Sequence, residues 1–145
     1  AYAKAFGLVH ERQLFLDING MDLRGEDRLV PDASLDDAAH DPAFAIRFHL
    51  HPSVKATLSR DGASVMLLLP NKAGWRFSAR GGRLSLETSV YLPDSKSARP
   101  TQQIVISGVA GRPDRVLWAF KRMQSPARTR TTPAQCAPEL PLNAG

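Results

Sequence analysis

The 145-residue sequence predicts an all-β protein, an antiparallel β-sandwich of about 8–10 strands with a flexible C-terminal tail. Three observations favour this fold. Apolar and polar residues alternate with a period of two rather than 3.6. Turn residues separate the alternating runs at intervals of about 8–12 residues. Only residues 1–6 have the pattern of a helix start, and that stretch is too short to be stable alone.

The first half of the chain supplies four expected strands and one short charged run. Residues 13–18 and the charged run of residues 23–30 lie on either side of an Asn19-Gly20 turn. In residues 44–50, apolar side chains alternate with polar ones and small ones. Residues 55–59 and 64–69 lie on either side of Asp61-Gly62, which predicts a tight hairpin. Because residues 64–69 are apolar on both faces, we expect a central strand covered on both sides.

The second half supplies four more strands, at residues 75–80, 84–92, 102–107 and 116–120. Three stretches rich in proline, glycine or charge interrupt the pattern. Residues 31–42 form an acidic loop and residues 93–100 connect two strands. The last stretch has few large aliphatic side chains and cannot offset its ordering entropy. We therefore predict a folded domain at residues 1–123 and a flexible tail at residues 124–145.

Composition excludes several classes of protein. Hydrophobic residues make up 43% and charged residues 23%, as in globular domains. The formal charge of +5 suits a polyanionic partner without proving one. Apolar runs such as Val65–Leu69 are far too short to span a bilayer, so we predict no membrane insertion, and nothing predicts a nucleic-acid partner. A single cysteine, Cys136, excludes an internal disulfide and a cysteine-based zinc finger, and the common nucleotide-binding and hydrolase motifs are absent.

Histidines and acidic residues suggest a metal site. His49 and His51 are two residues apart on one strand, so both rings project from the same face. Imidazole nitrogen and carboxylate oxygen are common zinc ligands. His10, Asp27 and His49 would form such a set, with a fourth position for water. The alternatives are surface histidines, an Asp27 that pairs with a neighbouring arginine, and Glu26 as an equal rival for the carboxylate.

Cations gather around one predicted turn. Arg76, Arg80 and Arg83 are close in sequence, and other cations could extend the positive surface that they form: Arg12, Arg47 and Lys55. Such a surface would bind a carboxylated or sulfated polysaccharide. The alternative is an ordinary solvated face.

Aromatic residues have structural explanations. Trp75 and Trp118 could stack on sugars, but they share a face with Phe77 and Phe120, which favours a core position. Tyr91 lies on a polar strand face and is not assigned a catalytic role.

Six segments resemble, in order and spacing, the C-terminal part of heparinase II/III-like proteins. They are residues 10–29 (HERQLFLDINGMDLRGEDRL), 44–56 (FAIRFHLHPSVKA), 74–77 (GWRF), 84–91 (LSLETSVY), 103–108 (QIVISG) and 116–122 (VLWAFKR). Proteins of this family resemble polysaccharide lyases in which an α/α toroid precedes an antiparallel β-sandwich. The lyases cleave uronate-containing chains by β-elimination, and several hold a structural zinc in the sandwich.

The resemblance implies that this chain is the C-terminal sandwich of such a lyase. The domain would pack against the toroid of the same parent chain and contact an acidic polysaccharide through Arg76, Arg80 and Arg83. His10, Asp27 and His49 would be the zinc ligands, with His51 as a substitute. No catalytic residue is implied here, so the chain alone is expected to be inactive. The parent would reside in a bacterial periplasm or cytoplasm. The alternative is a carbohydrate-binding or purely structural module.

Overall fold

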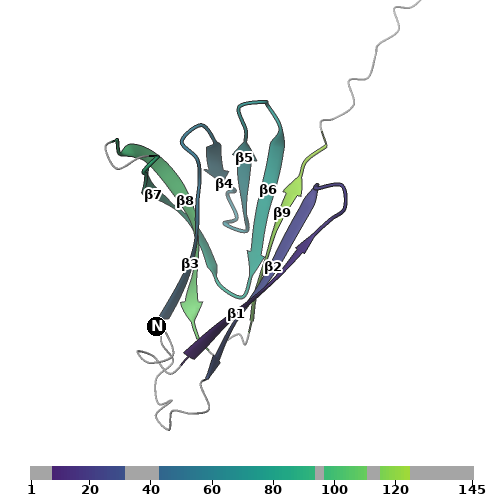
Figure 1. Cartoon of the computed structure of the whole chain (residues 1–145), viewed down its shortest axis with the longest axis vertical. Helices are drawn as coiled ribbons and strands as arrows, with labels where there is room; N and C mark the ends of the chain where they lie inside the picture. Colours follow the sequence, from purple (N-terminus) through teal and green to yellow (C-terminus); the bar gives the residue numbers. More distant parts are fainter. Residues whose placement is uncertain (1–7, 32–42, 94–96, 111–114, 125–145) are drawn as a thin grey trace, which may run out of the picture.

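The structure, a computed structural model, describes residues 8–31, 43–93, 97–110 and 115–124. These residues form two antiparallel sheets and contain no helix, which confirms the predicted all-β sandwich (Figure 1). In this described part, no helix long and apolar enough to cross a membrane is present. Several predicted features lie outside the described residues. These are the possible helix start, the acidic loop after Pro31, Cys136 and nearly all of the predicted tail.

Nine strands are present in the described ranges. They are β1 (Leu8–Leu16), β2 (Asp22–Pro31), β3 (Ala43–His49), β4 (Lys55–Leu58), β5 (Ser64–Leu68), β6 (Gly74–Arg80), β7 (Arg83–Tyr91), β8 (Arg99–Val109) and β9 (Arg115–Arg122). One sheet has six strands in the order β1-β2-β9-β6-β5-β4, and the other has three in the order β3-β8-β7.

Glycine-containing turns lie where the sequence predicts them. Gly20 has a φ of 66° between β1 and β2, and Gly62 has a φ of 67° between β4 and β5. Both positions need a left-handed backbone, which glycine adopts without steric cost. The predicted Asp61-Gly62 hairpin is therefore confirmed. Gly81, with a φ of 93°, carries the chain from the six-stranded sheet into the three-stranded one.

The core lies between the two sheets and follows the predicted alternation. Phe77, Ile104 and Ile106 are fully buried. Phe48 of β3 reaches across the sandwich, with its ring centroid 4.8 Å from the Trp118 ring and 5.0 Å from the Phe77 ring. Trp118 is buried, as predicted for a core tryptophan, and Trp75 is partly buried against the same cluster.

One prediction about coverage is wrong. Residues 64–69 are not covered on both faces, because Val65 and Leu67 are buried whereas Leu68 is 46% exposed. No second layer within the described ranges covers the outer face of the six-stranded sheet. At the end of β7, Val90 is also exposed although it shares a face with buried Leu84. The two sheets diverge at that end (Figure 1), so β7 loses its packing partner there.

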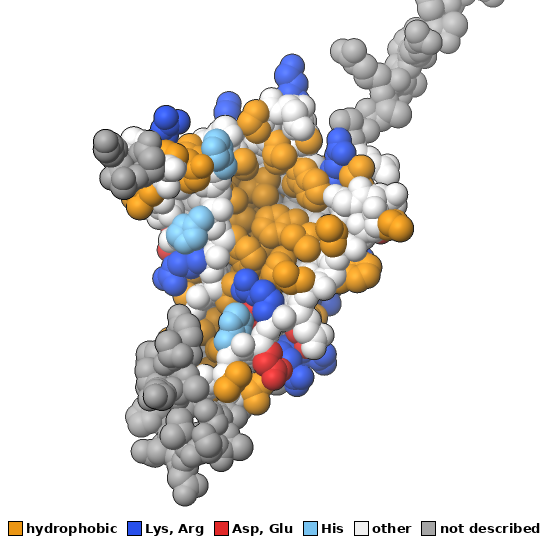
Figure 2. Space-filling view, in the orientation of Figure 1, with side chains coloured by type: hydrophobic (Ala, Val, Ile, Leu, Met, Phe, Trp, Pro, Cys, Tyr) orange, Lys and Arg blue, Asp and Glu red, His pale blue; other side chains and the backbone are white. Residues whose placement is uncertain are grey.

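The unequal width of the two sheets leaves apolar surface open. Three strands cannot cover the inner face of six, and an apolar surface is visible between the sheets (Figure 2). At the β1 end of the wider sheet, Leu14 and Leu16 are each 63% exposed although they lie on its inner face. The uncovered ends of the sandwich are therefore candidate contact surfaces.

Candidate functional site

Asp27 is a buried carboxylate on the inner face of β2. In the sheet register it lies between Arg12 of β1 and Val116 of β9. Its exposed fraction is 2%, and it is the only charged side chain classed as buried in the described residues. A buried carboxylate is stable only when its oxygens are paired, so its partners decide what this site does.

Three donors surround the Asp27 carboxylate. Arg12 Nε donates to Oδ1 at 2.6 Å, and His10 Nε2 lies 2.6 Å from the same oxygen. Trp118 Nε1 donates to Oδ2, also at 2.6 Å. The Arg12 guanidinium carbon lies 5.7 Å from the centre of the Trp118 ring, within cation–π range. These contacts tie β1, β2 and β9 together through one side chain.

Gly25 makes room for the Trp118 donor. Gly25 and Trp118 are cross-strand partners on the inner face. A Cβ atom at Gly25 would overlap the Trp118 six-membered ring. The indole can therefore lie flat over β2 and reach Asp27 only because residue 25 has no side chain. No local sequence signal points to roles in this site for Gly25, Trp118 or Arg12: the alternation of β9 predicts only that Trp118 is buried, and Arg12 is expected on the positive surface.

The environment of Asp27 favours its ionised form. Burial is the largest single influence and acts to raise the pKa. The hydrogen bonds from Arg12, Trp118 and His10, together with the Arg12 charge, outweigh burial and lower the pKa of Asp27 below its ordinary value. Asp27 is thus an anion at neutral pH and serves as the acceptor of this cluster.

The proposed zinc ligands are only partly brought together. His10 and Asp27 are in contact, as the predicted set requires. His49 is at the exposed end of β3, where its Nδ1 lies 2.9 Å from Ser89 Oγ of β7. His51 follows β3, with its Nδ1 2.6 Å from Ser53 Oγ and its ring centroid 5.0 Å from that of Tyr91.

This arrangement does not fit a zinc ion. Both Asp27 oxygens already accept short hydrogen bonds, and the Arg12 cation already compensates the carboxylate charge that would attract a metal. Across the described ranges, no group of three or more His, Cys, Asp or Glu side chains could hold a metal. The rival ligand Glu26 points to the opposite face of β2, 4.0 Å from Arg28 and 3.9 Å from Arg115.

The three predicted substrate-binding arginines do not share one surface. Arg76 and Arg80 alternate with buried Phe77 on β6, so they lie on the outer face of the six-stranded sheet. Arg83 precedes buried Leu84 on β7, so it lies on the outer face of the three-stranded sheet. The turn that joins them crosses between sheets, which separates side chains that are close in sequence.

The outer face of the six-stranded sheet is nevertheless rich in cations, and we call it the basic face. Its strands place ten charged side chains there: the cations Arg24, Arg28, Lys55, Arg76, Arg80, Arg115 and Lys121, and the acids Glu11, Asp22 and Glu26. Arg76 is directly opposite Lys121, and Arg28 is directly opposite Arg115. Like charges in direct cross-strand pairs are unfavourable.

The acids of the basic face are concentrated on β2. Asp22 lies 2.7 Å from Arg24 and 3.5 Å from Lys121. The hydrogen bond from Arg24 lowers the pKa of Asp22. Arg76 and Arg80 form no ion pair with any described residue. The same holds for Lys55 of β4, so the positive charge of this face that no described acid compensates lies on β6 and β4.

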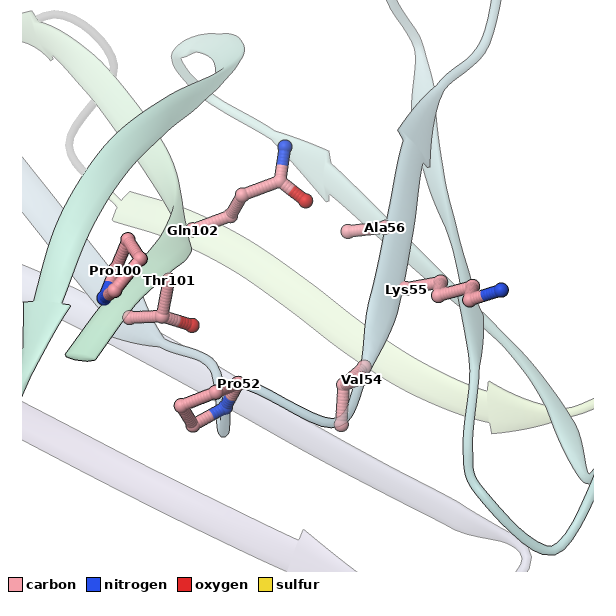
Figure 3. Close-up of a pocket in the computed structure, with 7 residues that line it drawn as sticks. All are labelled: Pro52, Val54, Lys55, Ala56, Pro100, Thr101 and Gln102. Atoms are coloured by element: carbon pink, nitrogen blue, oxygen red, sulfur yellow. The ribbon is translucent and has the colours of Figure 1, made fainter. Parts of the chain in front are cut away.

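A shallow hollow opens at the β4 edge of the six-stranded sheet, between β4 and β8 (Figure 3). Its lining consists of Pro52, Val54, Lys55, Ala56, Pro100, Thr101 and Gln102. No carboxylate, imidazole or thiol is among these side chains. The hollow therefore offers no acid–base or nucleophilic group, and its surface is suited to packing.

Comparisons with known proteins agree with this architecture. The chain is 41% identical over 104 residues to "FtsZ-localized protein C" of Caulobacter vibrioides, a match that covers 69% of this chain and 18% of that protein. The chain thus spans about a fifth of the length of this relative. No solved structure matches. The chain matches the family described as "Heparinase II/III-like, C-terminal" over residues 1–132, and it therefore belongs to that family.

Proposed function

We propose that this chain is the non-catalytic C-terminal domain of a heparinase II/III-like polysaccharide lyase and holds an acidic polysaccharide on its basic face. The observation that carries the proposal is the distribution of charge. Seven cations and three acids share that face. Lys121 shares Asp22 with Arg24, whereas Arg76 directly opposite it has no described ion pair, so an anion that bridges Arg76 and Lys121 would supply the missing negative charge.

A sheet face suits an extended polymer. Arg76 and Arg80 are four residues apart on β6, which places them roughly 13 Å apart along one strand. Guanidinium groups bind carboxylates and sulfates through paired hydrogen bonds. A chain of uronate residues would present anions along the same line, whereas a compact anion would contact only one arginine. An acidic polysaccharide is therefore the ligand we propose.

Glycan binding can be tested with charge-matched variants. Arg76→Ser with Arg80→Ser removes two cations from the basic face, and Arg47→Ser with Arg83→Ser removes two from the outer face of the other sheet. We expect the first pair to weaken binding to polygalacturonate by about tenfold and the second pair to change it little. Wild-type binding should weaken as salt rises. Equal losses in the two double variants would contradict a site on the basic face.

Catalysis by β-elimination would belong to the rest of the longer protein. Asp27 is paired with three donors, and the hollow holds no acid–base group. We therefore expect the 145-residue chain to form no unsaturated uronate from acidic polysaccharides, as followed by the ultraviolet absorbance of the new double bond. Formation of that product by the purified chain would contradict a non-catalytic role.

The α/α toroid of the parent would pack at the β4 and β7 side of the sandwich. Leu58, Val90 and Leu92 are exposed there, beside the hollow between β4 and β8. These residues lie away from the cations of β6, so the docked domain would leave the basic face open. A longer protein with Val90→Lys and Leu92→Lys should show weaker contact between the two domains, measured by proteolysis of the segment that joins them.

A second candidate is a role at the same location as FtsZ. The relative from Caulobacter vibrioides carries FtsZ localisation in its name, and 41% identity over 104 residues makes a shared location a reasonable proposal. Co-sedimentation of the chain with assembled FtsZ would support this role. Failure to co-sediment, together with salt-sensitive glycan binding, would favour the polysaccharide proposal.

A further inference from the structure

Strand β1 is an edge of the six-stranded sheet, and no strand of the described ranges pairs with its outer side. It has nine residues, of which Val9, Leu14, Phe15 and Leu16 are large, apolar and 42–63% exposed. It contains neither proline nor lysine, the residues that commonly block further pairing at a sheet edge. The opposite edge, β4, has only four residues and begins with Lys55. The two edges of one sheet thus differ in their capacity to accept another strand.

The backbone of β1 has free hydrogen-bonding groups at every second residue. Asp17 N–H donates to the Asp22 carbonyl at 2.9 Å, which fixes the odd-numbered residues as those bonded to β2. In an antiparallel ladder, the alternate residues direct their N–H and C=O groups to the other side. Leu8, His10, Arg12, Leu14 and Leu16 therefore present donors and acceptors to the open edge.

The sequence of β1 is complementary to itself in the antiparallel direction. It reads LVHERQLFL, with apolar residues at both ends and polar residues in the middle. A two-fold axis at Arg12 places Leu8 opposite Leu16, Val9 opposite Phe15, and Glu11 opposite Gln13 of a second copy. This register aligns all nine residues, and it pairs the even-numbered residues, which are those with free backbone groups.

Arg12 would ordinarily oppose such pairing, because the Arg12 side chain of one copy would lie directly opposite that of the other copy. An inward-pointing charge is a known protection of edge strands. Here Asp27 of the same chain binds Arg12 Nε at 2.6 Å and neutralises its charge. The buried carboxylate therefore removes the charge repulsion at the centre of the register.

We propose that two copies of this chain associate through antiparallel pairing of their β1 strands, centred on Arg12. The pairing joins the two six-stranded sheets into one continuous sheet and satisfies the free backbone groups of both edges. The outer faces of the two sheets then lie side by side, with the exposed Val9 and Phe15 side chains covering each other. The partner of this surface is a second copy, rather than an unrelated peptide.

The first experiment measures association directly. Light scattering of the 145-residue chain over a range of concentrations should show a dimer that dissociates on dilution. Leu14→Pro removes an amide that points away from β2 and should weaken the dimer by at least about tenfold, with Leu14→Ala weakening it less. Thermal melting of each variant checks that the fold is kept. A monomer at every concentration would overturn the proposal.

The second experiment tests the register and does not need a disruptive variant. In a Cys136→Ser background, Glu11→Cys and Gln13→Cys are introduced into separate chains. The proposed register makes these two positions a non-hydrogen-bonded pair about 4.5 Å apart at Cα, which suits a disulfide. Oxidation of the mixed proteins should yield a covalent dimer, and neither variant alone should do so. Cross-linking of either variant alone, or none in the mixture, would overturn the register.

Discussion

The two faces of β2 hold adjacent carboxylates in opposite environments. Asp27 faces inward, is 2% exposed, and accepts three contacts at 2.6 Å. Glu26 faces outward, with a 25% exposed side chain and two arginines no closer than 3.9 Å. Because successive residues of a strand face opposite sides, Glu26 forms solvent-screened ion pairs whereas Asp27 is a buried, hydrogen-bonded anion.

The two carboxylates therefore have different roles: Asp27 stabilises the fold, whereas Glu26 belongs to the face proposed to bind a ligand. The inward carboxylate is satisfied by its own chain and joins three strands, so it has no free coordination for a metal or substrate. The outward face keeps its charges hydrated and available to a ligand. The following changes should affect the inner face strongly and the outer face weakly.

Gly25→Ala should have the largest effect on stability. The added methyl group would overlap the Trp118 ring and force the indole away from Asp27, at a cost of about 3 kcal/mol. Gly74→Ala on β6 is the matched control, because a Cβ there meets only ordinary contacts with Met123. Urea denaturation of the two variants compares the free energies of unfolding. Equal losses would mean that Trp118 does not need the space at residue 25.

Asp27→Ala should cost about 2 kcal/mol, because Trp118 Nε1 would be buried without an acceptor. The partly exposed His10 and Arg12 can recover hydration, which limits the loss. Glu26→Ala, on the other face of the same strand, should cost about 0.5 kcal/mol or less. Similar values for the two variants in chemical denaturation would remove the distinction between the faces.

Acid should lower the stability of the fold through protonation of Asp27. Because the folded-state pKa of Asp27 is lowered, its contribution is present above the ordinary aspartate pKa of about 4 and is lost as the pH falls through the lowered pKa. Asp22 and Asp61 also have lowered pKa values, so the wild type alone does not isolate Asp27. Melting temperatures measured from neutral to acid pH should fall less steeply for Asp27→Asn.

Removal of metals should have the smallest effect. The Asp27 site does not fit zinc, so a chelator should leave the melting temperature of the wild type unchanged. Elemental analysis of the wild type and of His49→Ala, both purified without chelator, gives a second measurement. A fall in melting temperature that zinc reverses, with less zinc in His49→Ala, would restore the predicted His10, Asp27 and His49 site.

The alternation of residues predicts the strands, because period-two patterning and Gly turns are local properties. It also predicts the inward phase of Trp118 and Phe48. The pairing of His10 with Asp27 follows instead from the expected metal-ligand set, not from alternation. The partners Arg12 and Trp118 of Asp27 depend on the register of β1 and β9 across β2, which no local pattern encodes. The coverage of Leu68 and Val90 depends on the unequal width and divergence of the sheets. Arg83 is close to Arg76 and Arg80 in sequence, but the turn between β6 and β7 places it on the other sheet.

Binding of an acidic polysaccharide to the basic face can be located residue by residue. The most direct measurement is the change in backbone amide chemical shifts when a short polygalacturonate oligomer is added to the chain. We expect shifts along β6 and β9, around Arg76, Arg80 and Lys121, and we expect them to decrease with added salt. Shifts confined to β3, β8 and β7, or absent at low salt, would contradict it.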